Sequence, residues 1–418
     1  MENNSRRAFT KKALASLALP GIIPELLATP KINNQVSPDA EEYWQAIKNH
    51  FRFAPDLKYF NNASLGSCPE AVRKGTNEFR DLLDSFPSRY MWGGWKDEIE
   101  KTRQDVADLF SVSDEEIALI HNTTEGMNLV AQSMDFEDGD EIILADHEHT
   151  SGYIPFQVWQ ERKNVKLVRP TLPLMPSSKE EVVEAYRKAI TPKTKMIVMC
   201  HIVNTNGMIL PVKEVSALAH EKGILVAVDG AQSAGMFPIN LDHLGCDYYT
   251  ASAHKWLFAP KGIGVFYSRK SSQKHLKPLV VCRGFDDPSI RRLENYNTRN
   301  LPELLGLGVS INYVNEIGID KIGKRSYELK AYFRSKLEND ERFTLKSPVS
   351  DDLSSAIQVV EVSGKDVVTV KEQLFENAGI DCRPMTKFGL NAVRISLSIY
   401  ITKADIDMLV DELKKTAA

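Results

Sequence analysis

A lysine beside hydroxyl and imidazole side chains is the first residue whose surroundings indicate chemistry. Lys255 stands in Thr250-Ala251-Ser252-Ala253-His254-Lys255-Trp256, shortly before Gly262-Ile263-Gly264. A lysine amine becomes nucleophilic when a desolvated or cationic pocket lowers its pKa, and it can then form a Schiff base with an aldehyde cofactor. Ser252 and His254, on the same turn, could bond a phosphate. An isolated lysine is ordinarily a surface residue, and the glycine pair is too short for a dinucleotide fingerprint.

A carboxylate at the end of an apolar run is the second feature. Asp229 follows Ile224-Leu225-Val226-Ala227-Val228 and precedes Gly230-Ala231-Gln232. A buried carboxylate is costly unless a cation pairs with it, and a protonated pyridine nitrogen is a suitable partner. Such a pair would let electrons from a substrate carbanion move into the ring. The alternative is an ordinary strand-end aspartate that caps a turn.

A predicted helix start is the third feature, within His121-Asn122-Thr123-Thr124-Glu125-Gly126. The two threonine hydroxyls and the free amides of a helix N-terminus form an anion site that the helix dipole strengthens. Plain N-capping by Thr124 is the alternative, and it is compatible with anion binding.

The loop Ala145-Asp146-His147-Glu148-His149-Thr150 is the fourth feature. His149 could lie flat on an aromatic ring, or it could be an ordinary loop histidine. Metal binding is not expected, because no third ligand has a recognisable spacing and the pattern is not the helical H-E-x-x-H.

The elements that must position these motifs alternate in type. The expected strands are residues 117–120, 141–144, 166–168, 196–199, 224–228 and 264–267, and helical patterns cover 125–134, 179–190 and 212–221. Short β-rich runs separated by helix-length segments indicate βαβ units and a mainly parallel sheet. The motifs fall at strand ends or in the loops beyond, where open α/β sheets bind ligands.

The pattern changes near residue 300. A long helical pattern covers 302–340, and a strand at 356–362, a helix at 366–377, a strand at 393–397 and a helix at 403–414 follow. We therefore expect an α/β protein with a large domain, whose mainly parallel sheet is flanked by helices, and a smaller α+β C-terminal domain. A chain of 418 residues also exceeds what one hydrophobic core usually supports.

The overall composition excludes several classes of function. The formal net charge is -4, so no basic excess points to nucleic acid. The five cysteines form no CxxC pair, which signals neither a zinc site nor a disulfide framework. No apolar run of about 18 residues follows the N-terminus, so we expect no spanning helix and no stable membrane anchor.

The N-terminus resembles a twin-arginine export signal. Ser5-Arg6-Arg7-Ala8-Phe9-Thr10-Lys11 precedes a modest apolar run at 13–19 and small residues near Ala28. The resemblance implies the twin-arginine export machinery as a partner and a periplasmic or otherwise exported location, whereas a mere basic tail would leave the protein cytoplasmic. The expected division is a signal peptide at 1–29, an N-terminal segment at 30–66, the large domain at 67–300 and the small domain at 301–418.

Taken together, the motifs resemble the class V aminotransferase family of fold-type I pyridoxal-phosphate (PLP) enzymes. The resemblance lies in the order and spacing of residues 229–232, 252–255, 123–125 and 148–149, and it extends from about Tyr59 to Glu412. That family includes cysteine desulfurases, selenocysteine lyases, kynureninases and isopenicillin N epimerases.

The resemblance implies a role for each site residue. Lys255 would hold PLP as a Schiff base and move the α-proton, Asp229 would bind the pyridine nitrogen, and Gln232 would bond the ring hydroxyl. His149 would stack on the ring, with Asn204 near the ring or the substrate. The phosphate would be held by Thr123, Thr124, Ser252 and His254.

Three more positions are candidates, two of them carried over from the family. Thr298 lies in a segment that resembles the one entering the neighbouring subunit's phosphate site, although Asn297 replaces the usual glycine; a homodimer is implied. Arg394 resembles the arginine that binds the substrate α-carboxylate, for which a guanidinium fork is suited. Asn62, in the strand and loop at 59–66, is a further substrate-binding candidate.

One departure separates the branches of the family. Cysteine desulfurases carry a persulfide cysteine on the loop before the carboxylate arginine, but residues 384–393 contain none, and Cys382 falls in the preceding strand. The arrangement resembles the isopenicillin N epimerase branch. We therefore expect a PLP-dependent enzyme of epimerase or aminotransferase type that acts at the α-carbon of an amino acid or amino-acid-containing metabolite. PLP-dependent C–S lysis or desulfurase-like β-elimination, and a non-catalytic binding relative, are the alternatives.

Overall fold

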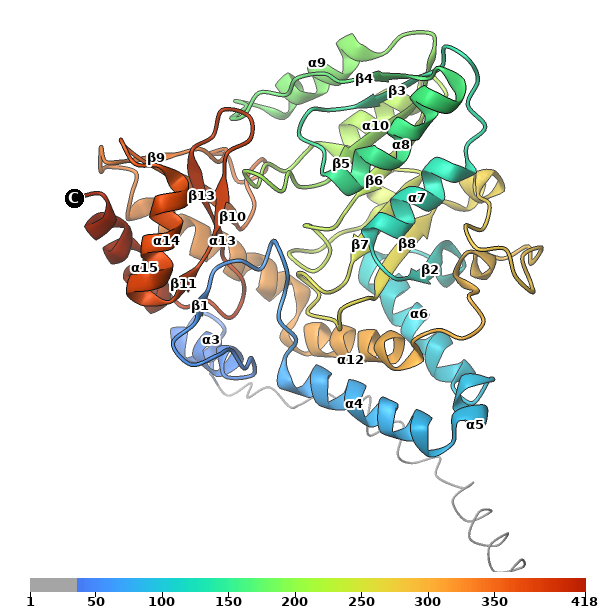
Figure 1. The fold of residues 1–418 in the computed structure, drawn as a ribbon, viewed down its shortest axis with the longest axis horizontal. Coiled ribbons are helices and arrows are strands. Elements are labelled where there is room, and N and C mark those ends of the chain that lie inside the picture. Colours follow the sequence, from blue (N-terminus) through green and yellow to red (C-terminus); the bar gives the residue numbers. More distant parts are fainter. Residues whose placement is uncertain (1–35) are drawn as a thin grey trace, which may run out of the picture.

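The structure, a computed structural model, describes residues 36–418. The predicted twin-arginine signal at 1–29 lies outside the described residues. Figure 1 shows a large domain built around one sheet and a smaller domain formed by the C-terminal elements, with the first described helix beside the smaller domain.

A seven-stranded sheet forms the centre of the large domain, in the order β2-β8-β7-β6-β5-β3-β4. Its strands are β2 (Ile117–Ile120), β3 (Glu141–Leu144), β4 (Lys166–Val168), β5 (Thr194–Cys200), β6 (Leu225–Asp229), β7 (Tyr248–Ser252) and β8 (Gly264–Ser268). Strands β3 to β7 pair in parallel, whereas β8 is antiparallel to both β2 and β7. The predicted α/β class with a mainly parallel sheet is confirmed.

Helices cover the sheet, and most strands are buried along their length, as expected for a sheet packed on both faces. The helices of this domain are α4 (Glu70–Ser85), α5 (Pro87–Met91), α6 (Lys96–Phe110), α7 (Thr123–Ser133), α8 (Thr150–Lys163), α9 (Lys179–Ala189), α10 (Val212–His220) and α11 (Leu241–Leu244). Three short 3-10 turns lie at Asp114–Glu116, Lys270–His275 and Ile290–Glu294. Helices α7, α9 and α10 confirm the predicted helical patterns.

The long helix predicted at 302–340 is wrong, because the structure has two helices there. Helix α12 (Leu301–Ile317) and helix α13 (Ile319–Ser335) meet at Gly318, whose φ of 95° no continuous helix allows. Helix α12 packs against α4 and α6 of the large domain, so the chain enters the small domain after Gly318.

An antiparallel sheet in the order β12-β13-β10-β9 forms the small domain. Its strands are β9 (Phe343–Leu345), β10 (Ile357–Val362), β12 (Arg383–Met385) and β13 (Ala392–Ser396), with helices α14 (Val367–Ala378) and α15 (Lys403–Thr416) beside them. The N-terminal part of the chain adds β1 (Lys58–Tyr59), which pairs in parallel with β11 (Ile380–Asp381). It also adds α3 (Glu41–Lys48), whose Lys48 contacts Asp405 of α15 at 2.6 Å.

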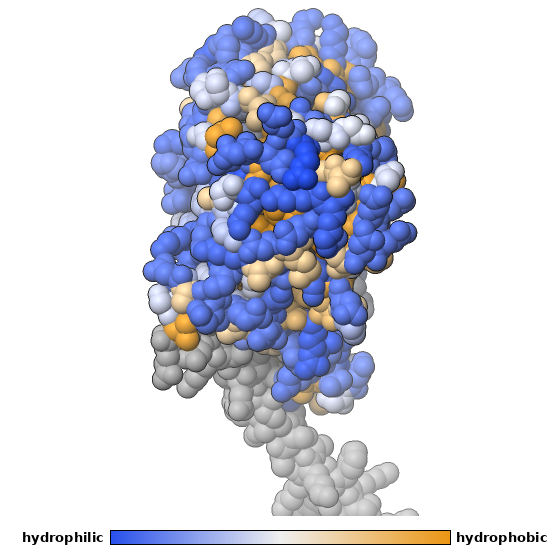
Figure 2. Space-filling model, turned by 90° about the vertical axis from the view of Figure 1, so that its left-hand side faces the viewer, coloured by the Kyte–Doolittle hydropathy of each residue, from blue (hydrophilic) through white to orange (hydrophobic). Residues whose placement is uncertain are grey.

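The outer face of the small domain is mostly hydrophilic, with small scattered apolar areas (Figure 2). Within residues 36–418, no helix has both the length and the hydropathy needed to cross a membrane.

Candidate active site

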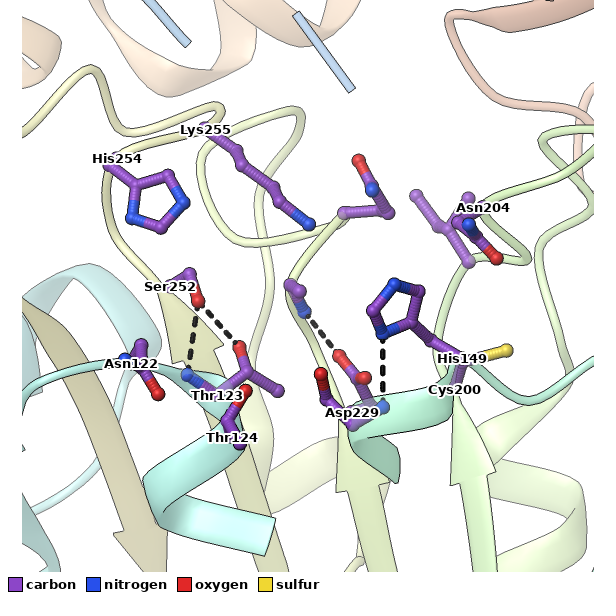
Figure 3. Close-up of a pocket in the computed structure, with 14 residues that line it drawn as sticks. Asn122, Thr123, Thr124, His149, Cys200, Asn204, Asp229, Ser252, His254 and Lys255 are labelled. Atoms are coloured by element: carbon purple, nitrogen blue, oxygen red, sulfur yellow. Dashed lines mark hydrogen bonds between the residues drawn. The ribbon is translucent and has the colours of Figure 1, made fainter. Parts of the chain in front are cut away.

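A cavity of about 220 Å³ opens at the carboxyl ends of β5, β6 and β7, where ligands of open α/β sheets bind (Figure 3). The lining residues are Asn122, Thr123, Thr124, His149, Ser151, Cys200, Ile202, Asn204, Asp229, Ala231, Gln232, Ser252, His254 and Lys255. Nine of the predicted site residues are among them. Asn62, Thr298 and Arg394 are not.

Lys255 extends into this cavity (Figure 3), and its Nζ makes no hydrogen bond to the described residues. Burial lowers the pKa of Lys255 to about 8; the charge of Asp229 opposes this effect, and the charges of Arg394 and Arg383 add to it. Roughly a tenth of the amine is therefore neutral near pH 7, far more than for an ordinary lysine, and the neutral form is the one that attacks an aldehyde.

Asp229 is the last residue of β6 and lies in the same cavity. Its Oδ1 accepts a hydrogen bond from the Ala231 amide at 2.9 Å, while Oδ2 makes none to the described residues. A nearly buried carboxylate with one open oxygen is suited to a cationic N–H ligand.

The opposite end of the cavity is formed by the start of α7 and the end of β7. The Ser252 Oγ lies 3.0 Å from the Thr123 amide and 2.9 Å from the Thr123 hydroxyl. Ser252 is the last residue of β7, so the turn predicted at 252–255 begins after it, and the strand itself was missed. Hydroxyls at a helix N-terminus are suited to a phosphate.

Asn122 caps α7, because its Oδ1 accepts from the Glu125 amide at 3.0 Å. The alternative in which Thr124 caps the helix is wrong: Thr124 lies inside the helix and lines the cavity. An asparagine directly before Thr-Thr-Glu is a common N-cap signal, and it could have located this residue.

His254, at the same end of the cavity, has an imidazole nitrogen without a hydrogen-bond partner. Its Nδ1 is buried without a hydrogen-bond partner, and burial, followed by the charges of Lys255 and Lys261, lowers its pKa to about 4. The imidazole is therefore neutral near pH 7, and an unpaired buried nitrogen of this kind fits a phosphate oxygen or hydroxyl.

The middle of the cavity presents an imidazole and an amide. His149 caps α8, since its Nδ1 accepts from the Ser151 amide at 3.2 Å, and its ring lines the cavity. Gln232 is held at both ends of its amide: Nε2 donates to the Ala63 carbonyl at 2.8 Å and Oε1 accepts from Trp256 at 2.9 Å. One N–H of Gln232 remains for a ligand.

Asn62 lies behind the cavity wall and is fully buried. Its Oδ1 accepts from the Tyr400 hydroxyl at 3.0 Å, and its Nδ2 lies 3.4 Å from the Lys255 carbonyl. Gly66, in the same loop, packs so closely that a Cβ atom would lie 2.2 Å from that carbonyl. This loop therefore holds the backbone of Lys255, and the role of Asn62 as a substrate contact stays a prediction.

Arg394 lies on β13 and is only 1% exposed. It donates to the Asn204 carbonyl at 2.8 Å, to the Ser64 Oγ at 2.6 Å and to Asn61 at 3.2 Å, and its Nε has no partner. A guanidinium has five N–H donors, so two remain. Burial and the charge of Arg383 lower its pKa. A buried cation without a carboxylate partner is suited to an anionic ligand.

Thr298 is exposed and lies away from the cavity lining of its own chain. Asn297 has a φ of 56°, in the left-handed region where glycine or asparagine is favoured, so the replacement of glycine is compatible with the turn. The neighbouring Tyr296 donates to Glu125 in the first turn of α7, which ties this segment to the helix.

The thiols near the site are buried. Cys382 is 2% exposed, and burial raises its pKa to about 12. Cys200 lines the cavity, but burial, followed by the charge of Glu148, raises its pKa well above the usual value. Neither is a ready thiolate nucleophile.

The loop at 145–150 provides no cluster of metal ligands. In the described part of the chain, no group of three or more His, Cys, Asp or Glu side chains could hold a metal ion. Instead, the His147 ring packs 4.4 Å from Phe388 of the small domain, and Glu148 accepts from the Cys200 amide at 3.0 Å.

Comparison with known proteins agrees with this geometry. The profile of the aminotransferase class-V family matches residues 59–409. The chain belongs to the aminotransferase class-V family. Among its curated relatives is the isopenicillin N epimerase of Streptomyces clavuligerus, which is 29% identical to this chain over 88% of this chain and 97% of the relative. A probable cysteine desulfurase of Halalkalibacterium halodurans is 31% identical over 86% of this chain and 93% of the relative.

Solved structures of similar fold cover nearly the whole class V chain. A cysteine desulfurase from Escherichia coli has a TM-score of 0.79 and 24% identity, over 91% of this chain and 98% of that one. A lysine variant of C-DES with glycine covalently linked to its PLP has a TM-score of 0.78 and 20% identity, over 88% and 98%. The fold is therefore the fold-type I, PLP-dependent one.

The residues of this class V site fit PLP. The open amine of Lys255 suits the aldehyde, the open oxygen of Asp229 suits a protonated ring nitrogen, and the His149 ring lines the same cavity. The helix start with Thr123 and Ser252 suits the phosphate.

Proposed function

We propose that this PLP-dependent class V enzyme acts at the α-carbon of an amino acid or amino-acid-containing metabolite, as an epimerase or an aminotransferase. The observation that carries the proposal is Lys255, a buried amine with a lowered pKa that shares one cavity with the carboxylate of Asp229. Bound PLP would withdraw electrons from the substrate's α-carbon.

The protein's own groups then have separate tasks. Lys255 Nζ, once released by the substrate amine, holds or returns the α-proton. Asp229 keeps a positive charge on the group bound to it, since a carboxylate stabilises a neighbouring cation. The two open N–H groups of Arg394 fix the substrate carboxylate and thereby its orientation.

Incubation with a panel of amino acids in D₂O tests the reaction type. Epimerisation incorporates deuterium at the α-carbon and yields both enantiomers, whereas transamination converts the amino acid into its oxo acid. Chiral chromatography and mass spectrometry distinguish the two, with Lys255→Ala as the inactive control. Borohydride reduction first shows that the protein carries PLP on Lys255. If such protein then gives no product and incorporates no deuterium with any compound, a non-catalytic relative is favoured.

Desulfurase-like β-elimination is the second candidate, since cysteine desulfurases are among the relatives. A persulfide route needs a thiolate at the substrate. The loop between β12 and β13 has no cysteine, and Cys382 and Cys200 are buried thiols with raised pKa values. C–S lysis without a protein thiol is tested by the same panel, in which cysteine and cystine would yield pyruvate.

We also propose that the protein is exported by the twin-arginine machinery. The proposal rests on Ser5-Arg6-Arg7-Ala8-Phe9 and the apolar run that follows. Because PLP is made in the cytoplasm, a route that carries folded proteins suits a holoenzyme. Changing both Arg6 and Arg7 to Lys keeps the positive charge of the segment. The variant should nevertheless remain in the cytoplasm, as measured by cell fractionation. An unchanged distribution would overturn the export proposal alone.

A homodimer with shared sites is proposed as well. Its support is the exposed Thr298, tied by Tyr296 to the start of α7 but lying away from the cavity of its own chain. Thr298→Ala should weaken PLP retention, measured by dialysis, while light scattering reports the dimer. A monomer, or retention equal to wild type, would refute the shared site.

A further inference from the structure

Two arginines of the small domain lie side by side, and neither has an acidic partner among residues 36–418. Arg383 of β12 and Arg394 of β13 are directly opposite in the antiparallel pairing of the two strands. Like charges in opposite positions are destabilising. Arg383 donates to the Ser64 Oγ at 3.2 Å and Arg394 donates to the same oxygen at 2.6 Å. Two guanidinium groups therefore converge on one hydroxyl, a shape that suits an anion.

A third cation stands on the loop that follows β12. Lys387 is exposed, and its side-chain ammonium group makes no hydrogen bond or ion pair within residues 36–418. The next residue, Phe388, anchors this loop on the large domain by packing against His147. Leu390 and Met385 form a small apolar cluster with Leu174 of the large domain. The loop is therefore docked beside the cavity.

The charges of Arg383 and Lys387 also act on groups that line the cavity. Burial is the main cause that lowers the pKa of His149, and both Lys387 and Arg383 lower it further. Arg383 also lowers the pKa of Lys255. The charge of Asp229 has the opposite effect on both pKa values; Asp229 lines the cavity, and its Oδ1 accepts from the Ala231 amide. The cavity mouth thus has an excess of positive charge.

We propose that the substrate carries a second acidic group, a side-chain carboxylate, that Arg383 and Lys387 bind at the cavity mouth while Arg394 binds the α-carboxylate. The proposal rests on the proposed function and specifies its substrate class. The loop that holds a reactive thiol in the persulfide enzymes would here hold an ammonium group that selects acidic side chains.

The matched pairs glutamate and glutamine, and aspartate and asparagine, test this class, because each pair differs only in the side-chain charge. The measurement is the apparent dissociation constant of each amino acid for the PLP-loaded enzyme, from the change in cofactor absorbance. At least one acid should bind about tenfold more tightly than its amide, the effect of one charge-assisted hydrogen bond.

Two variants locate the effect. Lys387→Met and Arg383→Met should each remove most of the preference for the acid and leave amide binding unchanged. Lys222→Met, which removes one exposed charge at the end of α10, is the control and should bind like wild type. Lys387→Glu should reverse the preference toward the amide.

The outcomes distinguish failure of the second acidic site from failure of the proposed function. Equal binding of acid and amide by the wild type, or an acid preference that survives in both methionine variants, would overturn the second acidic site alone. If all four amino acids leave the cofactor absorbance unchanged while another compound of the panel changes it, the second acidic site is overturned; if no compound of the panel changes it, the proposed function is itself overturned.

Discussion

Glu148 is a buried acid whose charge should destabilise the fold, and Glu148→Gln tests this directly. Its Oε1 accepts from the Cys200 amide, but its Oε2 is buried without any partner. Burial raises the pKa of Glu148 to about 8; the Cys200 bond opposes the increase, and the charge of Asp229 adds to it. The carboxyl group is therefore mainly protonated at neutral pH.

The pKa difference gives the magnitude and the sign. The folded protein holds a proton on Glu148 up to about pH 8, whereas the unfolded chain releases it near 4.5. Stability should therefore fall as pH rises from 4.5 to 8. At about 1.4 kcal/mol per pH unit, the full penalty is roughly 4–5 kcal/mol. Relaxation and water entry reduce it, and we expect about 1–3 kcal/mol.

Glutamine keeps the acceptor for Cys200 and cannot ionise. Urea unfolding of the PLP-free protein at pH 5 and pH 8 should show a smaller loss of unfolding free energy for Glu148→Gln than for wild type. Glu221→Gln, at an exposed position, should follow wild type. In PLP-loaded protein, the difference between Glu148→Gln and wild type in the loss of unfolding free energy should be smaller. The reason is that a cation on Asp229 offsets the charge that raises the pKa of Glu148. Parallel pH profiles for Glu148→Gln and wild type would refute the reasoning.

Four further outcomes follow from the site. Lys255→Ala should lose the borohydride-reducible PLP absorbance, and retention of that absorbance would remove Lys255 from its role. In the wild type, the rate of PLP uptake should rise as pH passes through about 8 and level off above it, because the amine is half neutral at its pKa. Asp229→Asn should keep some PLP but lose most turnover, and near wild-type rates would make the carboxylate structural. Arg394→Lys should raise the KM by about 30-fold, or ~2 kcal/mol, since one ammonium cannot replace a guanidinium fork; unaltered kinetics would mean that no α-carboxylate is bound there. Cys382→Ala should retain turnover, because that thiol is a buried packing group, and loss of activity with a persulfide on the wild type would restore the desulfurase reaction.

Several elements could be predicted from short stretches of sequence. The strands β2, β3 and β6 are contiguous apolar runs, because both faces of the sheet are covered. Lys255 and Asp229 follow from motifs of a few residues, and the structure places both in one cavity. The strand β7 was missed, because Tyr-Tyr-Thr-Ala-Ser mixes hydroxyl residues into a buried strand. Its burial comes from the neighbouring β6 and β8, which no local pattern reports.

The sequence by itself therefore determined the α/β class, the order of the main elements and nine of the cavity residues, because each signal lies within one element. Only the tertiary structure decided which distant residues meet. Ser64 joins Arg383 and Arg394 across more than 300 positions of sequence, β1 pairs with β11, and Glu148 lies buried near Asp229. Such contacts depend on how elements far apart in the sequence pack, and the burial that shifts the pKa values of Lys255 and Glu148 exists only after that packing.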